Sequence, residues 1–307
     1  MNVETFSQWL RRQGHRVVRT ESACWFDRGP RALLAFPWHR PIQPAREELA
    51  GLLRRERAVA LRFTSPADAP GGVAGYDVVL EDPSYDLQSV SRSTRPVVRK
   101  ALERCEIAPL TLERYAREGW SLELDTRTRQ GRSARGGRKA WERMARAAEG
   151  LPGFEVWGAT VDGRLASTLF LAQVGDCVTY LSQQSLQELW PAHANHALAY
   201  EVTRTVRSRP GVTMIHYGLQ GLDAPPSVDD FKCHLGFARR PVRYHVEFHP
   251  LVAPLVNPLS HALLRRARER WHENTLIAKG EGLVRVFLEG RSPPPRALRQ
   301  KLERSRV

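Results

Sequence analysis

The chain has 307 residues, 42% of them hydrophobic, and a formal net charge of +14 at pH 7. This length and hydrophobic content suffice for one large or two ordinary hydrophobic cores. The sequence lacks the run of about 18 apolar residues that a transmembrane helix needs. The N-terminus shows no basic region followed by an apolar core, so we expect no secretory signal and a cytoplasmic location.

The cysteines and the charge indicate which structural frameworks and which kinds of partner to expect. The four cysteines, at positions 24, 105, 177 and 233, are far apart and form no Cys-x-x-Cys pair, so we expect reduced thiols without a disulfide or zinc framework. One interpretation of the basic charge is an anionic partner such as RNA, a lipid surface or a phosphate-bearing substrate. The alternative is that the abundant arginine reflects a GC-rich genome and no particular partner.

Residues 1–90 carry a pattern of their own. Phe6, Trp9 and Leu10 have helical spacing. A later amphipathic stretch has Pro44 in its first turn, where proline suits a helix. The expected elements that follow the first helix are strands at 22–27 and 31–36, a helix over 44–57, and strands at 58–63 and 76–81.

The next segment is rich in arginine. A helix is expected from about Pro96, and Arg92, Arg95 and Arg99 share one of its faces because they are three and four residues apart. This face is either an anion-binding stripe or a solvated surface. Further along we expect a helix over 111–118 that ends at Gly119, a strand at 120–124, a loop over 125–138 and a helix over 139–148.

The loop predicted over 125–138 contains five arginines with almost no apolar residue. Flexible backbone with several guanidinium groups can clamp a phosphate or carboxylate, so Gln130 and Arg132 are candidates for acceptor or phosphate binding, together with Arg95 and Arg99. The alternative is an exposed basic loop without a ligand.

Residues 153–248 organise the rest of the chain. Asp162-Gly163 is a strong signal for a β-hairpin turn. Pro210-Gly211 ends a helix whose Leu198, Val202 and Val206 form one apolar stripe. The expected elements are strands at 154–161, 165–174 and 177–184, a helix over 195–209, a strand at 213–218, a helix over 229–235 and a strand at 242–248. Two hairpins followed by a helical crossover predict a mixed sheet of the α/β (α+β) class.

This order of elements resembles the core of the GNAT acyltransferase superfamily. The run Phe231-Lys232-Cys233-His234-Leu235-Gly236-Phe237 is similar to the Phe-Lys-x-x-x-Gly-Phe run of the Fem-type branch, whose members transfer aminoacyl groups in peptidoglycan assembly. The resemblance covers roughly residues 90–250. It implies a GNAT acyltransferase domain over 91–250, with a mixed sheet flanked by helices.

The same resemblance extends to the flanking segments. Fem-type proteins carry two GNAT-like halves, so residues 1–90 are interpreted as a degenerate first half. An unrelated small α+β cap is the alternative for that segment. Residues 251–307 are interpreted as a helical extension with a basic tail, in which Leu259, Leu263, Leu264 and Ala267 line one side of a helix and several arginines lie opposite or flank it. Such a helix can pack on the domain, lie on an anionic membrane or dock RNA.

The resemblance also implies a reaction, the formation of an amide between an activated acyl or aminoacyl donor and an amine acceptor on a small molecule or peptide. GNAT folds polarise the donor carbonyl where the third core strand splays from its neighbour, and hold donor phosphates at the next helix N-terminus. Asn195 is expected to be the N-cap of that helix. The corresponding donor-binding candidates are Gln183, Gln184, Ser185, His193, Asn195 and His196.

One departure bears on the donor. The usual GNAT pyrophosphate loop is rich in glycine, whereas no glycine lies between Gln184 and Leu198. This disfavours standard acetyl-CoA binding and, together with the basic charge, favours aminoacyl-tRNA as the co-substrate. Two rivals remain open, a conventional acyl-CoA-dependent N-acetyltransferase and a non-catalytic GNAT-like protein that binds RNA or an anionic head group.

Two residues are the catalytic candidates. By resemblance, Lys232 faces the reaction channel, where an ammonium group can hold a phosphate or the developing oxyanion. Tyr217, at the end of a predicted buried strand, can donate a proton to a leaving group or bind substrate. A structural role is the alternative for each. His193 and His196 lack further ligands at suitable spacing, so we expect no metal.

Overall fold

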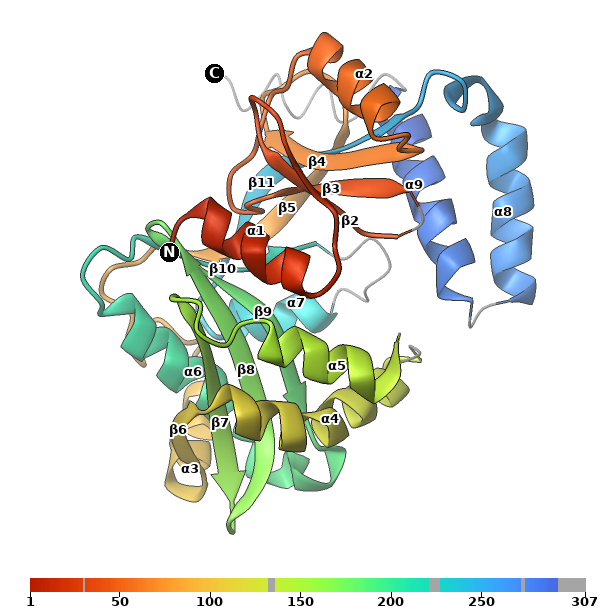
Figure 1. Ribbon diagram of the computed structural model, residues 1–307. Coiled ribbons are helices and arrows are strands. Elements are labelled where there is room, and N and C mark those ends of the chain that lie inside the picture. The colour runs from red at the N-terminus through yellow and green to blue at the C-terminus, as the bar shows by residue number, and fades with distance from the viewer. Residues whose placement is uncertain (30, 132–135, 221–226, 272–273, 292–307) are drawn as a thin grey trace.

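The computed structural model describes residues 1–29, 31–131, 136–220, 227–271 and 274–291. All strands of these residues join one mixed sheet of 11 strands with helices on both faces (Figure 1). The strands are β1 (Val17–Arg19), β2 (Cys24–Asp27), β3 (Ala32–Phe36), β4 (Ala60–Pro66), β5 (Val73–Leu80), β6 (Glu106–Leu110), β7 (Phe154–Val161), β8 (Arg164–Val174), β9 (Cys177–Ser185), β10 (Met214–Leu219) and β11 (Ala238–Phe248).

The helices of the described residues flank this sheet. They are α1 (Val3–Arg12), α2 (Arg46–Arg55), α3 (Arg95–Arg104), α4 (Leu112–Arg129), α5 (Gly137–Arg146), α6 (Ala194–Arg207), α7 (Ser227–His234), α8 (Pro258–Arg270) and α9 (Thr275–Arg291), with the short 3-10 helices η1 (Gln187–Ala192) and η2 (Ala253–Leu255). Among the described residues, no helix has the length and apolar character needed to cross a bilayer.

The same order of elements occurs twice. Strands β1, β2 and β3 form an antiparallel meander, α2 follows, and β4 then pairs parallel to β3. Strands β7, β8 and β9 form a second meander, α6 follows, and β10 pairs parallel to β9. The predicted mixed α/β sheet is therefore confirmed, and its first half repeats the second in shortened form.

The two halves share strands. The spatial order is β1-β2-β3-β4-β11-β5-β10-β9-β8-β7-β6, so β11 lies between β4 and β5, and β5 lies beside β10. Strand β5 precedes residue 90 and β11 follows it, so the sheet is continuous across that position. The division at residues 90 and 250 stays a prediction.

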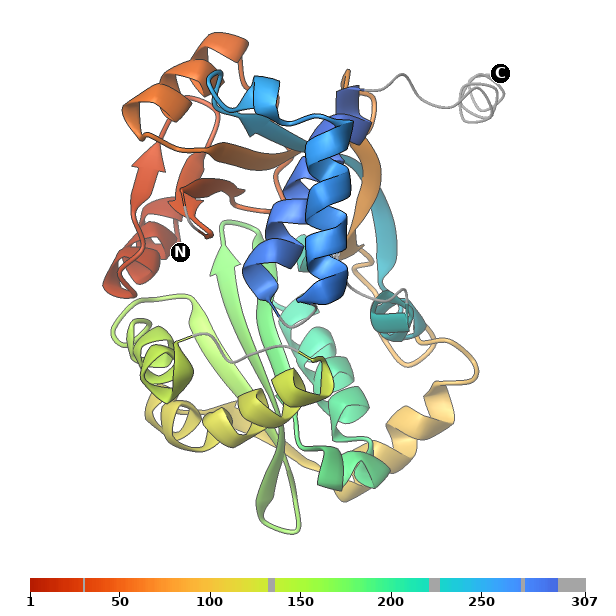
Figure 2. The same ribbon diagram turned by 90° about the vertical axis from the view of Figure 1, so that its right-hand side faces the viewer.

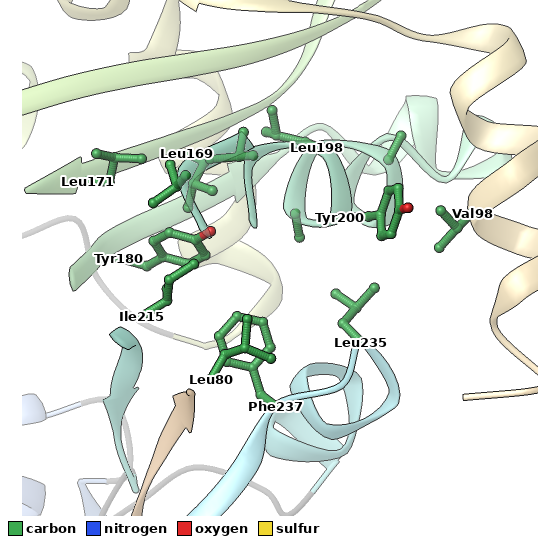
Figure 3. Close-up of a cluster of buried hydrophobic side chains, with 14 of the residues drawn as sticks. Leu80, Val98, Leu169, Leu171, Tyr180, Leu198, Tyr200, Ile215, Leu235 and Phe237 are labelled. Carbon is green, nitrogen blue, oxygen red and sulfur yellow. The ribbon is translucent and has the colours of Figure 1, made fainter. Parts of the chain in front are cut away.

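A large core fills one face of the second half. Leu169, Leu171, Tyr180 and Ile215 from the strands meet Leu198 of α6 there, with Leu235 and Phe237 closing the cluster (Figure 3). The predicted stripe of α6 is confirmed, because Leu198, Val202 and Val206 are each fully buried. Burying a side chain of this size contributes about 1.5–3 kcal/mol. The core therefore fixes α6 firmly against the sheet.

The prediction for residues 111–138 was wrong in part. Helix α4 continues through the strand predicted at 120–124 and into the predicted loop as far as Arg129. Gly119 lies inside the helix and does not end it. It stands where α4 meets α5, and a Cβ at this position would come within 2.7 Å of the Trp141 ring. The glycine thus permits close helix packing. Strands β1 and β6, which are the two edge strands of the sheet, were not predicted.

Candidate active site

The candidate site lies where β9 and β10 separate. Their parallel pairing ends at Thr179, although β9 continues to Ser185. Leu181 is the extra residue of a bulge in β9, because its two neighbours pair with consecutive residues of β8. A bulge bends its strand, so β9 diverges from β10 beyond this point. This is the segment in which the sequence predicted donor binding.

Tyr217 on β10 contacts β9 beyond the point where the two strands stop pairing. Its phenol O–H donates to Gln183 Oε1, and Gln183 Nε2 donates to the backbone oxygen and the Oδ1 of Asn195, each at 3.2 Å. Asn195 Nδ2 donates in turn to Ser185 Oγ at 3.0 Å. The structure thus connects four of the predicted site residues. Burial raises the pKa of Tyr217 well above its ordinary value, so the phenol stays protonated.

Lys232 lies beside this network on α7. The helix is anchored by Leu235 and Phe237, both buried. Lys232 Nζ donates to Asp229 Oδ1 at 2.8 Å and stands 5.2 Å from the centre of the Tyr217 ring. A cation at this distance over an aromatic face is attracted to it. The side chain keeps only 13% exposure, so its ammonium group is held in one place.

Two residues of the site were not predicted. Asp229 is 7% exposed and accepts from Lys232 through one oxygen, while its Oδ2 accepts the phenol O–H of Tyr76 at 3.0 Å. The spacing of Asp229 and Lys232, three residues apart on a helix, was a usable signal. Tyr76 offered none, because it comes from β5, and only the strand order brings β5 next to β10.

Asn195 is not the N-cap of the helix, contrary to prediction. Helix α6 begins at Ala194, and its N-cap is His193, whose φ of 54° is left-handed. The Asn195 side chain forms hydrogen bonds with the strands instead. Besides its bonds to β9, its Oδ1 accepts from Ser167 Oγ on β8 at 2.7 Å. Asn195 therefore ties the first turn of α6 to the diverging part of the sheet.

Gln184 belongs to a different environment. Neighbouring strand residues point to opposite faces, so Gln184 faces away from Gln183. Its Nε2 donates to Glu123 Oε2 at 3.2 Å, and its Oε1 accepts from Thr168 Oγ1 at 3.0 Å. The structure therefore places Gln184 in a buried network with α4, separate from Lys232.

The two histidines lie at the start of α6. His196 packs with its ring centre 5.5 Å from that of His193 and 5.0 Å from that of Phe231 on α7. Burial, with smaller contributions from His193 and His234, lowers the pKa of His196 to about 4. It is therefore neutral at pH 7 and can offer a phosphate hydrogen bonds but no charge. The described residues contain no cluster of three or more His, Cys, Asp or Glu placed to hold a metal ion.

The predicted acceptor residues are not gathered at this site. Arg95 donates to Gln88 and to the backbone oxygen of Val90, and so braces the loop that precedes α3. That loop supports the end of α7, because Ser91 N donates to the backbone oxygen of His234 at 2.8 Å. Arg99 is exposed on α3, and Gln130 is the exposed C-cap of α4. Arg132 lies outside the described residues.

A buried polar cluster occupies the other face of β10. Asp77 on β5 is fully buried and accepts from Arg240 on β11, with Nε to Oδ1 at 3.1 Å and Nη2 to Oδ2 at 2.5 Å. His216 Nε2 lies 3.9 Å from the same carboxylate. No residue in the described ranges gives the ring nitrogens of His216 or His39 a hydrogen bond. Sequence patterns did not single out any of these four residues.

This cluster predicts acid sensitivity. Burial lowers the pKa of His216 to about 3 and that of His39 to about 4, from an ordinary value of 6.5. As pH falls below 6.5, the unfolded chain binds protons that the native state does not, so the free energy of unfolding falls by about 1.4 kcal/mol per pH unit for each histidine. Above pH 6.5 these two groups leave stability unchanged.

Urea denaturation between pH 7 and 4.5 measures this effect. Carboxylates also contribute to the acid slope, so the comparison is with His216→Leu, which removes one titrating group. We expect the variant's slope to be smaller by about 1.4 kcal/mol per pH unit. Identical slopes in the two chains would show that His216 takes up its proton in the folded state.

Two hollows lie elsewhere in the molecule. One, with a volume of about 820 Å³, lies between α2, β11 and α9 and includes Phe63, Phe248 and Phe287 in its wall. The other, of about 200 Å³, lies over β3 and β4. Neither is lined by Lys232 or Tyr217. We place the candidate site where β9 and β10 diverge, because the groups with suitable chemistry meet there.

The fold is shared with solved structures. FemX superposes with a TM-score of 0.57 at 14% identity, over 81% of this chain and 92% of that chain. The C-terminal domain (DUF2156) of a putative lysylphosphatidylglycerol synthetase from Agrobacterium fabrum gives 0.54 at 14% identity, over 79% and 87% of the two chains. A conserved protein of unknown function from Bacteroides thetaiotaomicron gives 0.53 at 12% identity, over 79% and 88%.

No protein-family model matches the chain, and no curated protein matches it. The likeness to FemX confirms the expected FemX-like fold. At 14% identity it concerns the fold alone.

Proposed function

We propose that the protein is an N-acyltransferase that moves an aminoacyl group from a charged tRNA to an amine acceptor. The observation that carries the proposal is the position of Lys232, held between Asp229 and the Tyr217 ring beside the point where β9 and β10 diverge. A fixed ammonium group at this point can bind a carbonyl oxygen as negative charge develops on it. The FemX-like fold and the basic charge are consistent with such a substrate.

The reaction would form one bond and break one. The acceptor nitrogen attacks the ester carbonyl carbon of the aminoacyl-tRNA, and the carbonyl oxygen becomes an oxyanion that Lys232 stabilises. The bond from carbon to the ribose oxygen then breaks. Tyr217, kept protonated by burial, supplies a proton to that leaving oxygen. The acceptor nitrogen releases one proton as the amide forms, and this proton returns through solvent to the Tyr217 phenolate, so the step consumes no net proton.

The residues around this pair position it. Asp229 holds the ammonium group from one side, and Tyr76 holds Asp229. Gln183 and Asn195 fix the phenol of Tyr217 relative to β9. Holding reacting groups within a narrow range of geometry is itself a large part of catalysis.

The segment that precedes α6 disfavours coenzyme A as the carrier of the acyl group. A pyrophosphate site at a helix N-terminus needs backbone N–H groups that a phosphate can approach closely. Here the N-cap is His193, and η1 precedes it without a glycine. Side chains therefore stand where a glycine-rich loop would leave the backbone open.

We expect acetyl-CoA to bind weakly or not at all for this reason. Isothermal titration calorimetry with acetyl-CoA checks it, and bulk tRNA in the same buffer serves as the comparison. A ligand at 100 times its Kd adds about 2.7 kcal/mol to the free energy of unfolding, so thermal shift provides a second readout. Saturable micromolar binding of acetyl-CoA would favour a conventional acyl-CoA-dependent enzyme instead.

A further inference from the structure

Exposed apolar side chains are concentrated in one part of the molecule. Eight large apolar side chains of the described residues are exposed, and six of them lie between residues 251 and 276: Leu251, Leu255, Leu259, Leu263, Trp271 and Leu276. Leu259 and Leu263 retain 71% and 58% exposure. The other two, Leu124 and Trp190, lie apart on α4 and η1. Single exposed leucines are ordinary on a protein surface, but such a local group is not.

Helix α8 carries the centre of this group. It lies on the outside of the molecule, with α9 between it and the sheet (Figures 1 and 2). Leu259, Leu263, Arg266 and Arg270 follow one another at spacings of four, three and four, so they form one row on the outer face. We call these four residues the outer row. Both arginines are exposed.

The outer row corrects the sequence-based expectation. Leu259 and Leu263 were expected to line the same side of the helix as Leu264 and Ala267. The structure buries that other side instead: Leu264 packs against the α9 and β11 cluster, while His261 Nε2 and Arg268 Nη1 lie 2.9 and 2.7 Å from the Glu281 carboxylate. The contacts that attach the helix therefore come from its other side, and the leucines of the outer row are mostly exposed.

We propose that the outer row of α8, with Leu251 and Leu255 before it, docks the protein on the surface of a bilayer that contains anionic lipids. Leucines that project from a helix lying in the plane of a membrane enter the boundary between head groups and acyl chains. Arg266 and Arg270 continue the same row and would meet the phosphates of the head groups. Trp271 follows at the end of the helix, the type of residue enriched at membrane interfaces.

Two other occupants fit this surface less well. RNA would use the arginines but would leave the leucines exposed. A second copy of the chain would set each α8 against another, so the arginines would face leucines or other arginines. Glu269 is the one exposed acid within α8, so such an interface would bury uncompensated positive charge.

Cosedimentation of the full chain with vesicles tests the proposal. Vesicles of phosphatidylcholine with about one third phosphatidylglycerol are the probe, and pure phosphatidylcholine vesicles are the comparison. We expect binding to the mixed vesicles, a decrease with added salt, and at least a tenfold loss in Leu259→Ser/Leu263→Ser. Arg266→Gln/Arg270→Gln should lose roughly fivefold per arginine on the mixed vesicles only.

Leu124→Ser is the matched control, because it removes an exposed leucine from a different helix. It should bind the mixed vesicles as the parent chain does. No binding to the mixed vesicles, or equal binding by the Leu259→Ser/Leu263→Ser variant, would overturn the proposal. A dimer in sedimentation velocity that this variant abolishes would assign the surface to a second copy. Loss of tRNA binding in the arginine variant, with vesicle binding unchanged, would assign it to RNA. The proposal is independent of acyl transfer, which none of these experiments measures.

Discussion

The double variant Lys232→Met/Asp229→Asn is expected to fold like the parent chain and to lose about a hundredfold or more in turnover. Lys232 and Asp229 form a nearly buried ion pair, with 13% and 7% exposure. Removing both charges of such a pair avoids the uncompensated buried charge that makes a single substitution costly. The amide oxygen introduced by Asp229→Asn would still accept the Tyr76 phenol, but no ammonium group would remain to stabilise an oxyanion. Melting temperature and turnover, measured on the same preparation, check the two parts.

The single variants separate catalysis from charge balance. Lys232→Met alone leaves Asp229 buried without its cation and should cost about 3 kcal/mol in the free energy of unfolding. Activity lost in that variant is therefore ambiguous. If the double variant recovers both stability and turnover, Lys232 serves only to neutralise Asp229. If it recovers stability alone, Lys232 acts on the substrate.

Arg240→Met is expected to destabilise the fold by about 3 kcal/mol, because it removes the partner of a carboxyl group that is fully buried in the interior. Asp77 has no exposure and receives two hydrogen bonds from Arg240, whose side chain is 26% exposed. The pair also connects β5 with β11, the strands through which the two halves interlock. Denaturant unfolding at pH 7 measures the loss.

Arg239→Met is the matched control for this prediction. Arg239 is the preceding residue of the same strand and pairs with Asp230 at the surface, where the side chains keep 43% and 54% exposure. Ion pairs of this kind contribute little, so the control should unfold as the parent chain does. Equal losses of unfolding free energy in the two variants would show that the buried Asp77 pair stabilises the fold no more than the exposed pair does.

Local signals predicted the second half of the fold well. The turn at Asp162-Gly163 has positive φ at both residues, 50° and 75°, as a tight hairpin between twisted strands requires. The meander β7–β8–β9 and the apolar stripe of α6 could be predicted because the turn signals and the spacing of apolar residues lie within each segment. Lys232 was placed on the right element for the same reason, because its helix is bounded by short-range signals.

What failed depended on contacts distant in sequence. Gly119 looked like a helix end until its close approach to Trp141 was known. The sequence of one strand does not tell which strand lies next to it, so the insertion of β11 between β4 and β5 could not be foreseen. Tyr76 and Asp77 enter the site and the buried cluster only through that order. The outward direction of Leu259 and Leu263 likewise depends on which side of α8 meets α9.

One measurement tests the central claim most directly, the transfer of a labelled amino acid from bulk charged tRNA to a pool of amino acids and lysine-containing peptides. Ester-linked label is released by mild alkali, whereas amide-linked label is stable. We predict alkali-stable label with the parent chain, none above background with Lys232→Met/Asp229→Asn, and none from labelled acetyl-CoA. The claim would be contradicted by stable label from acetyl-CoA but not from tRNA, by no stable label from tRNA, or by equal transfer in the variant.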